Sequence, residues 1–125
     1  MTQKSISINL MPGEVSLGEL RDIYTRHAPF NLEYGAWANI NVSCGAVADI
    51  VAKGDAAYGI NTGFGLLAQT RIADDQLALL QRNLVLSHCT GVGKLISSPI
   101  VRLIIALKIV SLSHGYSGVR PEVVQ

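Results

Sequence analysis

A glycine-rich segment, AYGINTGFG at residues 57–65, places a tyrosine and a phenylalanine among glycines and an asparagine. Loops of this composition either bind a phosphate through backbone N–H groups or hold one reactive side chain in place. The glycines are spaced G-x-x-x-G-x-G, which differs from the G-x-G-x-x-G pattern of dinucleotide-binding loops. The later segment GVGKL, residues 91–95, has Leu95 where a phosphate-binding loop needs Ser or Thr after its lysine. The sequence therefore disfavours nucleotide binding.

Tyr58 is the first candidate for a reactive side chain. The simpler interpretation of its loop is a surface turn in which glycines adopt positive φ angles. Tyr58 and Phe64 argue against a simple surface turn, because large aromatic rings on a loop usually occupy pockets. A phenol beside flexible glycines can also close over a substrate and withdraw, as catalytic lids do.

His88 is the second candidate. It follows Leu77, Leu80 and Leu84 on one row of a predicted helix, where a histidine is more often a core residue with one satisfied hydrogen bond. Its position at the C-terminal end of the helix favours a protonated ring. Cys89 points about 100° away around the helix, which disfavours a cysteine–histidine pair. The three histidines show no metal-ligand spacing, so we expect no metal.

The elements that would position these residues are mostly helical. Ser16 and Glu19 form a capping box for a helix that ends before Pro29, and Gly54 ends a helix predicted over 36–53. Asp74 or Asp75 is expected to cap the helix that carries His88. The remaining predicted elements are strands over 5–10 and 30–34, which pair with each other, a helix from Ser98 to about His114, and the start of another helix over 119–125. We therefore expect a mainly α-helical fold with a small two-stranded β element near the N-terminus.

The overall composition describes an apolar globular chain without a domain boundary or internal repeat. Of its 125 residues, 49% are hydrophobic and only 15% are charged, and the helix from Ser98 is apolar on nearly all sides. Such a helix must be enclosed on most sides, and a small domain with so little charge is expected to be covered by other polypeptide.

Net charge, cysteine spacing and the length of the apolar stretches indicate which partners and which compartment to expect. The formal net charge is +1 without a basic run, so nucleic acid is not an expected partner. Cys44 and Cys89 fit no disulfide or zinc spacing, which favours a reducing compartment. The longest apolar stretch, residues 99–113, is too short to span a bilayer, and no signal peptide is recognisable. We expect a soluble cytoplasmic protein that does not bind membranes.

Three long motifs carry a resemblance to a known family. They are AYGINTGFGLLAQTRI at 57–72, LQRNLVLSHCTGVG at 80–93 and RLIIALKIVSLSHGYSGVRP at 102–121. Together they resemble the N-terminal part of the aromatic amino acid ammonia-lyases and aminomutases, and within that family the lyases that act on histidine. The resemblance implies a mostly helical homotetramer whose active sites form where subunits meet.

The resemblance also implies a chemistry and roles for particular residues. The family removes ammonia from an amino acid without oxidation, using a methylidene-imidazolone (MIO) electrophile that forms from an Ala-Ser-Gly tripeptide. Tyr58 matches the tyrosine that acts as catalytic base or acid, and His88 matches the histidine that contacts the substrate ring. The residues expected to support the tyrosine loop are Gly59, Asn61, Gly63 and Gly65.

One departure from the family is severe, because no Ala-Ser-Gly occurs anywhere in the chain. We therefore interpret residues 1–125 as a single N-terminal portion of a larger lyase, truncated before that tripeptide and inactive alone. Conversion of histidine to urocanate is the favoured activity of the whole protein. The alternatives are a tyrosine or phenylalanine ammonia-lyase, an aminomutase, and a short protein without catalysis that serves as an interaction module.

Overall fold

The computed structural model describes residues 7–125, which divide into two units. One unit comprises the described residues up to Gly45 together with Leu95–Gln125, and the other comprises Ala46–Lys94. Residues 5 and 6 of the first predicted strand lie outside the described part of the chain.

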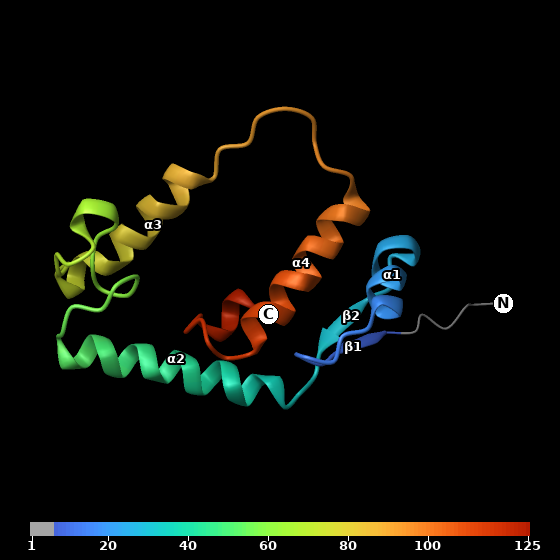
Figure 1. Ribbon diagram of the computed structural model, residues 1–125, viewed down its shortest axis with the longest axis horizontal. Coiled ribbons are helices and arrows are strands. Elements are labelled where there is room, and N and C mark those ends of the chain that lie inside the picture. Colours follow the sequence, from blue (N-terminus) through green and yellow to red (C-terminus); the bar gives the residue numbers. More distant parts are fainter. Residues whose placement is uncertain (1–6) are drawn as a thin grey trace. The chain divides into compact units, whose positions relative to one another are not determined.

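The first unit contains the two predicted strands. β1 (Ile8–Leu10) and β2 (Phe30–Leu32) pair in parallel, with Ile8 opposite Phe30 (Figure 1). Parallel neighbours cannot be joined by a tight hairpin, and helix α1 (Leu17–Arg26) provides the crossover between them. The expected two-stranded element is confirmed, although both strands are shorter than the alternating pattern indicated.

Helix α1 begins and ends at the residues that local signals indicate. The Ser16 hydroxyl accepts a hydrogen bond from the backbone N–H of Glu19, and the Glu19 carboxylate accepts one from the Ser16 backbone at 2.7 Å. This predicted capping box lowers the pKa of Glu19, first through the backbone bond and then through the Ser16 hydroxyl. At the other end, His27 adopts a left-handed conformation with φ 52° and closes the helix before Pro29.

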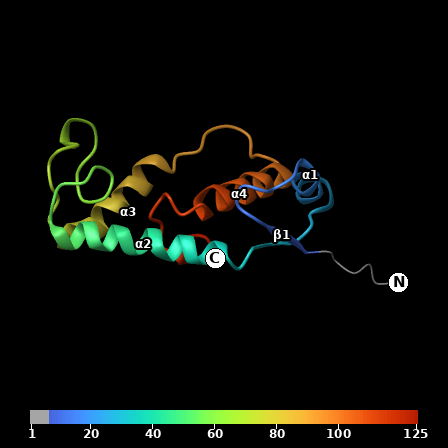
Figure 2. The same cartoon turned by 60° about the horizontal axis from the view of Figure 1, so that its bottom comes forward.

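The core of this unit lies where β1, α1 and α4 (Ser98–Ser113) meet. Helix α1 packs against α4, and Ile23 and Ala106 are fully buried with Leu10 (Figure 2). Burial of aliphatic side chains is the main source of stability at such a contact. The described helix starts one residue before Pro99, as the Ser-Pro signal predicts.

Arg102 ties α4 to the segment between α1 and β2. Its guanidinium donates to the backbone carbonyl of Ala28 at 2.9 Å and to that of His27 at 3.4 Å. The guanidinium carbon also lies 5.9 Å from the centre of the Phe30 ring. A cation that hydrogen bonds carbonyls at the end of α1 is stabilised by the helix dipole as well.

The other sides of α4 are open within this chain. Residues 7–125 cover α4 on one face only, although its apolar sequence predicts cover on most sides. The apolar residues that remain exposed on α4 are Ile100, Val101, Ile104, Ile105 and Leu107. This pattern matches the expectation that other polypeptide covers the helix.

The first unit ends in a turn that packs on α2 (Ala36–Lys53). The backbone N–H of Gly118 donates to the Ser43 hydroxyl at 2.7 Å, and a side chain at Gly115 would collide with the backbone of Asn39. Beyond the turn, the helix expected over 119–125 is present only as a short 3-10 turn, η3 (Pro121–Val123).

The second unit contains the remainder of α2, two 3-10 turns and helix α3. The turns are η1 (Gly65–Leu67) and η2 (Asp74–Gln76), and η2 leads directly into α3 (Leu77–His88). The prediction that Asp74 or Asp75 caps α3 is wrong, because the cap position is Gln76 and no side chain accepts a bond there. Asp74 instead pairs with Arg71 at 3.0 Å, and the 3-10 turn satisfies the backbone at the helix start.

Candidate active site

The glycine-rich loop runs from the end of α2 to the start of η2 and is held closed by backbone bonds. Gly54, with φ 78°, ends α2. Thr62 and Arg71 then form an antiparallel bridge, in which the Gly63 N–H donates to the Thr70 carbonyl at 3.1 Å. The bridge makes the two halves of the loop a single ordered piece, drawn in green in Figures 1 and 2.

Asn61 anchors the loop from inside. Its side chain is fully buried, and its amide oxygen accepts from the Ala57 N–H at 2.7 Å while its amide nitrogen donates to the Asp55 carbonyl at 2.9 Å. Its backbone carbonyl accepts from the Ile72 N–H at 2.8 Å. Buried amides are stable only when both ends are paired, and here both are. The result is a fixed backbone on the N-terminal side of Tyr58.

Two of the loop glycines are required for different reasons. Gly59 follows Tyr58 with φ 78°, a conformation that costs other residues energy, and no atom crowds the place of its missing side chain. Gly63 has no such backbone, but a Cβ there would lie 2.5 Å from the Leu67 Cβ. Gly59 therefore shapes the turn, and Gly63 permits close approach of η1.

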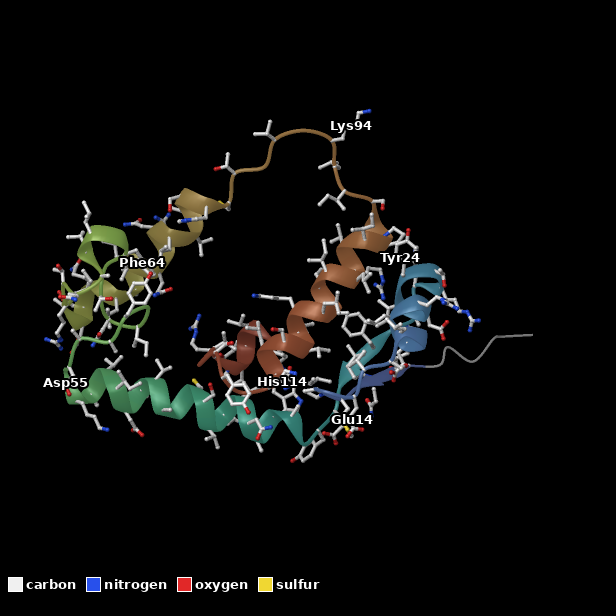
Figure 3. The ribbon with its side chains drawn as sticks, in the orientation of Figure 1. Glu14, Tyr24, Asp55, Phe64, Lys94 and His114 are labelled. Atoms are coloured by element: carbon white, nitrogen blue, oxygen red, sulfur yellow. The ribbon has the colours of Figure 1, made fainter. Side chains whose placement is uncertain are left out.

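Tyr58 projects from this anchored loop with its side chain 67% exposed. The ring of Phe64 contacts it edge to face, with the ring centres 5.8 Å apart and the planes at 66°. Phe64 is itself 38% exposed and extends from the loop in Figure 3. The loop thus holds its backbone rigid and leaves the phenol accessible, which suits a group that must meet a ligand.

His88 is the last residue of α3 and is exposed. Its ring nitrogen Nδ1 lies 2.8 Å from the Leu84 carbonyl oxygen and 3.0 Å from the Ser87 hydroxyl oxygen. The neighbouring Cys89 is a free thiol that donates to the Leu86 carbonyl at 3.6 Å. The ring is therefore not a buried core histidine in this chain, which was the alternative interpretation.

Both sequence candidates fall in the second unit, but they are not in direct contact. The hydrogen bonds of residues 7–125 include none between Tyr58 and His88. The other histidines, His27 and His114, belong to the first unit, where His114 stacks on Tyr116 at 6.5 Å between ring centres. No group of three or more potential metal ligands occurs among residues 7–125. Nor does any helix in that range have the length and apolar character of a membrane span.

Two neighbours of the candidate residues emerge from the structure and not from the motifs. The contact of Phe64 with Tyr58 depends on closure of the loop. Ser87 contacts His88, and a serine beside a helix-terminal histidine is a signal in the sequence for such a polar contact. A pocket of about 320 Å³ lies in the first unit beside Trp37 and Val124, and neither candidate residue lines it.

Comparison with known proteins identifies the family. Residues 15–125 match the family model described as aromatic amino acid lyase. The chain is 54% identical over 118 residues to histidine ammonia-lyase of Salmonella arizonae, covering 94% of this chain and 23% of that relative. This chain therefore spans about a quarter of the length of such relatives.

Solved structures agree with this match. The structure of histidine ammonia-lyase from Trypanosoma cruzi superposes with a TM-score of 0.86 at 32% identity, covering 96% of this chain and 23% of that one. Tyrosine aminomutase from Streptomyces globisporus also gives a TM-score of 0.86, at 25% identity over 95% of this chain and 23% of that one. The mainly helical fold is thereby confirmed as that of the N-terminal part of these enzymes. The chain belongs to the aromatic amino acid lyase family.

Proposed function

We propose that this chain provides one wall of an ammonia-lyase active site whose substrate is L-histidine. In this site Tyr58 is the catalytic acid or base, and His88 contacts the substrate ring. The observation that carries the proposal is the construction of the loop, in which a buried Asn61 with both ends of its amide paired holds the backbone while Tyr58 stays 67% exposed. A proton-transferring group needs a fixed position and access to substrate together.

Histidine is favoured over other amino acids by the similarity to histidine ammonia-lyases. The Salmonella arizonae relative is 54% identical, whereas the tyrosine aminomutase is 25% identical. A tyrosine or phenylalanine lyase, or an aminomutase, is the alternative within the family.

The electrophile that the resemblance implies requires a tripeptide that residues 1–125 do not contain. Methylidene-imidazolone forms from Ala-Ser-Gly and draws electrons from the bound amino acid, but residues 1–125 contain no Ala-Ser-Gly. Residues 1–125 therefore do not supply the tripeptide from which this group forms. We accordingly propose that the 125-residue chain alone is inactive and that further polypeptide completes the site.

The exposed apolar side chains of α4 support assembly with other polypeptide, as in a homotetramer of the whole protein. The same surface is what a binding module without catalysis would offer. The cytoplasm is the compartment that the free thiols Cys44 and Cys89 suit best.

A chimera tests the proposal directly. In it, this chain replaces the matching 118 residues of the Salmonella arizonae lyase. We expect the chimera to form urocanate from L-histidine with kcat/KM within about tenfold of the parent, a margin of about 1.4 kcal/mol. The Tyr58→Phe chimera should lose about 100-fold or more, the typical contribution of a positioned acid or base.

The alternatives give different results in the same assay. An assembled chimera that releases ammonia from tyrosine or phenylalanine in preference to histidine would favour the other substrates. An assembled chimera without any lyase activity would contradict a catalytic role and favour the binding module.

A further inference from the structure

Among residues 7–125, the ring of His88 has hydrogen-bond partners at Nδ1 only, and one of these partners indicates which nitrogen carries the proton. Nδ1 lies 2.8 Å from the Leu84 carbonyl oxygen, which can only accept a hydrogen bond. Nδ1 must therefore donate, and its proton sits on that nitrogen. In a neutral imidazole the other nitrogen, Nε2, is then an acceptor.

Ser87 completes this arrangement. Its hydroxyl donates to the Leu84 carbonyl at 3.0 Å, so its own proton is engaged there. The hydroxyl oxygen lies 3.0 Å from Nδ1 of His88, where its lone pairs can accept from the same N–H. The Leu84 carbonyl disfavours the tautomer in which Nδ1 is bare, and the Ser87 hydroxyl can accept from the Nδ1 proton as long as its own proton stays on that carbonyl.

We propose that Ser87 is a positioning residue for His88, and that it and the Leu84 carbonyl present Nε2 as a hydrogen-bond acceptor to the substrate. The inference rests on the proposed function, since it assumes that His88 meets the substrate ring. Its consequence is a preference for a substrate ring that offers a donor to Nε2, as the imidazole N–H of L-histidine does.

The strength of this selection follows from the cost of an unmade bond. A ring without a donor would leave the Nε2 lone pair desolvated and unpaired, which a closed site penalises. A ring donor pairs with it without displacing the bonds on Nδ1. The Ser87 contact thus acts on specificity through His88 and needs no contact of its own with substrate.

The tautomer can be measured without any activity. Ring nitrogens that carry a proton and those that do not have well-separated ¹⁵N shifts, and the chain labelled with ¹⁵N-histidine would be studied at pH 8.5, above the ordinary titration range of imidazole. The His88 signals are assigned by their loss in His88→Gln, and His27 and His114 serve as internal comparisons. We expect a protonated Nδ1 and a bare Nε2; a protonated Nε2 would overturn the proposal.

Variants of Ser87 test how much its hydroxyl contributes to the tautomer of His88. Ser87→Ala should move the two ring shifts toward an average of the tautomers, and Ser87→Thr should restore them because it keeps the hydroxyl. Ser111→Ala, at an exposed position of α4, is a matched control that should leave the His88 signals unchanged. Identical ring shifts in Ser87→Ala and the unsubstituted chain would contradict a positioning role.

The chimera provides the kinetic test. Ser87→Ala should raise KM for L-histidine about three- to tenfold, the factor that one neutral hydrogen bond makes, with kcat within about twofold. Ser87→Thr should recover the original KM. A fall in kcat with KM unchanged would overturn the proposal. An inactive unsubstituted chimera would refute the proposed function, while the ring shifts would still decide the tautomer.

Discussion

Phe64 meets Tyr58 edge to face, with ring centres 5.8 Å apart and planes inclined at 66°. Because η1 begins at the next residue, Gly65, the Phe64 ring is tied to the closure of the loop. The backbone before Tyr58 is fixed by Asn61, and its ring is supported by Phe64. The phenol is thus restrained from two sides while it stays accessible.

Removing the Phe64 ring should loosen Tyr58. In the chimera, Phe64→Leu is expected to lower kcat about two- to tenfold, because an aromatic pair of this geometry contributes about 0.5–1.5 kcal/mol beyond burial. Phe64→Tyr keeps the ring and should retain most of the rate. Phe30→Leu, which removes a ring from the other unit, is the matched control for a general loss of packing. Equal effects of the two leucine variants on kcat would show that the Tyr58 contact has no special role.

Asn61→Asp tests the anchoring role of Asn61, because aspartate has almost the same side-chain shape as asparagine. The carboxylate can still accept from the Ala57 N–H, but it cannot donate to the Asp55 carbonyl, and it places a buried charge there. We expect a loss of about 1–3 kcal/mol in the free energy of unfolding, or more because of the charge. Denaturant titration measures this loss.

Asn31→Asp is the control for the Asn61 anchor. The Asn31 amide donates to the exposed Ser7 hydroxyl at 2.9 Å, so its loss should change stability by no more than about 0.5 kcal/mol. A free energy of unfolding for Asn61→Asp equal to that of the unsubstituted chain would refute the anchoring role.

Gly63→Ala should damage the loop by overpacking. The added Cβ would lie 2.5 Å from the Leu67 Cβ and 3.0 Å from its carbonyl oxygen, which are parts of the loop that cannot rotate away. A cost of about 1–3 kcal/mol is expected from unfolding curves. Gly45→Ala is the opposite case, because Gly45 lies within α2 with no atom within 4 Å of an added Cβ. That variant should gain about 0.5–1 kcal/mol, and a similar loss in both variants would contradict the close contact.

The capping box of α1 should make stability depend on pH. The pKa of Glu19 is lowered from 4.5 in the folded chain by its bonds to Ser16. Since the unfolded chain has the higher pKa, this stabilisation is complete above about pH 4.5 and is lost as the pH falls through the folded pKa. The stability difference between the unsubstituted chain and Glu19→Gln should therefore shrink between pH 7 and pH 3.

Ser16→Ala removes the other half of the same box and should cost about 1 kcal/mol at pH 7. Urea unfolding at both pH values measures each difference. A Glu19→Gln difference that grows on acidification would have the wrong sign for this mechanism.

Signals that act within a turn of the chain were reliable here. Ser16 with Glu19 and the Ser98-Pro99 pair marked helix starts, and Gly54 marked the end of a helix predicted over 36–53 that the structure places at Ala36–Lys53. Each works through bonds or backbone angles of its immediate neighbours, so the sequence carries the information locally. The predicted cap at Asp74 or Asp75 was wrong, because a 3-10 turn over Asp74–Gln76 leads into α3 and makes Gln76 the cap position.

The candidate site, too, was predictable from the sequence only in part. Long contiguous motifs marked Tyr58 and His88 as the residues to consider, and their catalytic roles remain predictions. The glycines could be assigned to a loop from sequence, but the different reasons for Gly59 and Gly63 could not. A positive φ is a property of one residue, whereas the contact of Gly63 with Leu67 exists only once η1 has formed.

By itself, then, the sequence determined helices α1 to α4, the capping box of α1, the two-stranded element, and the family to which the motifs point, whereas the cap of α3 and the helix over 119–125 were predicted wrongly. Only the tertiary structure decided that the strands run parallel, that Asn61 bonds the backbone before Tyr58, that Phe64 contacts the Tyr58 ring, and that Nδ1 of His88 lies against the Leu84 carbonyl. The physical reason is the range of the forces involved. Caps and propensities act over a few residues of chain, but hydrogen-bond partners and ring contacts are chosen by distances that exist only after the chain has folded.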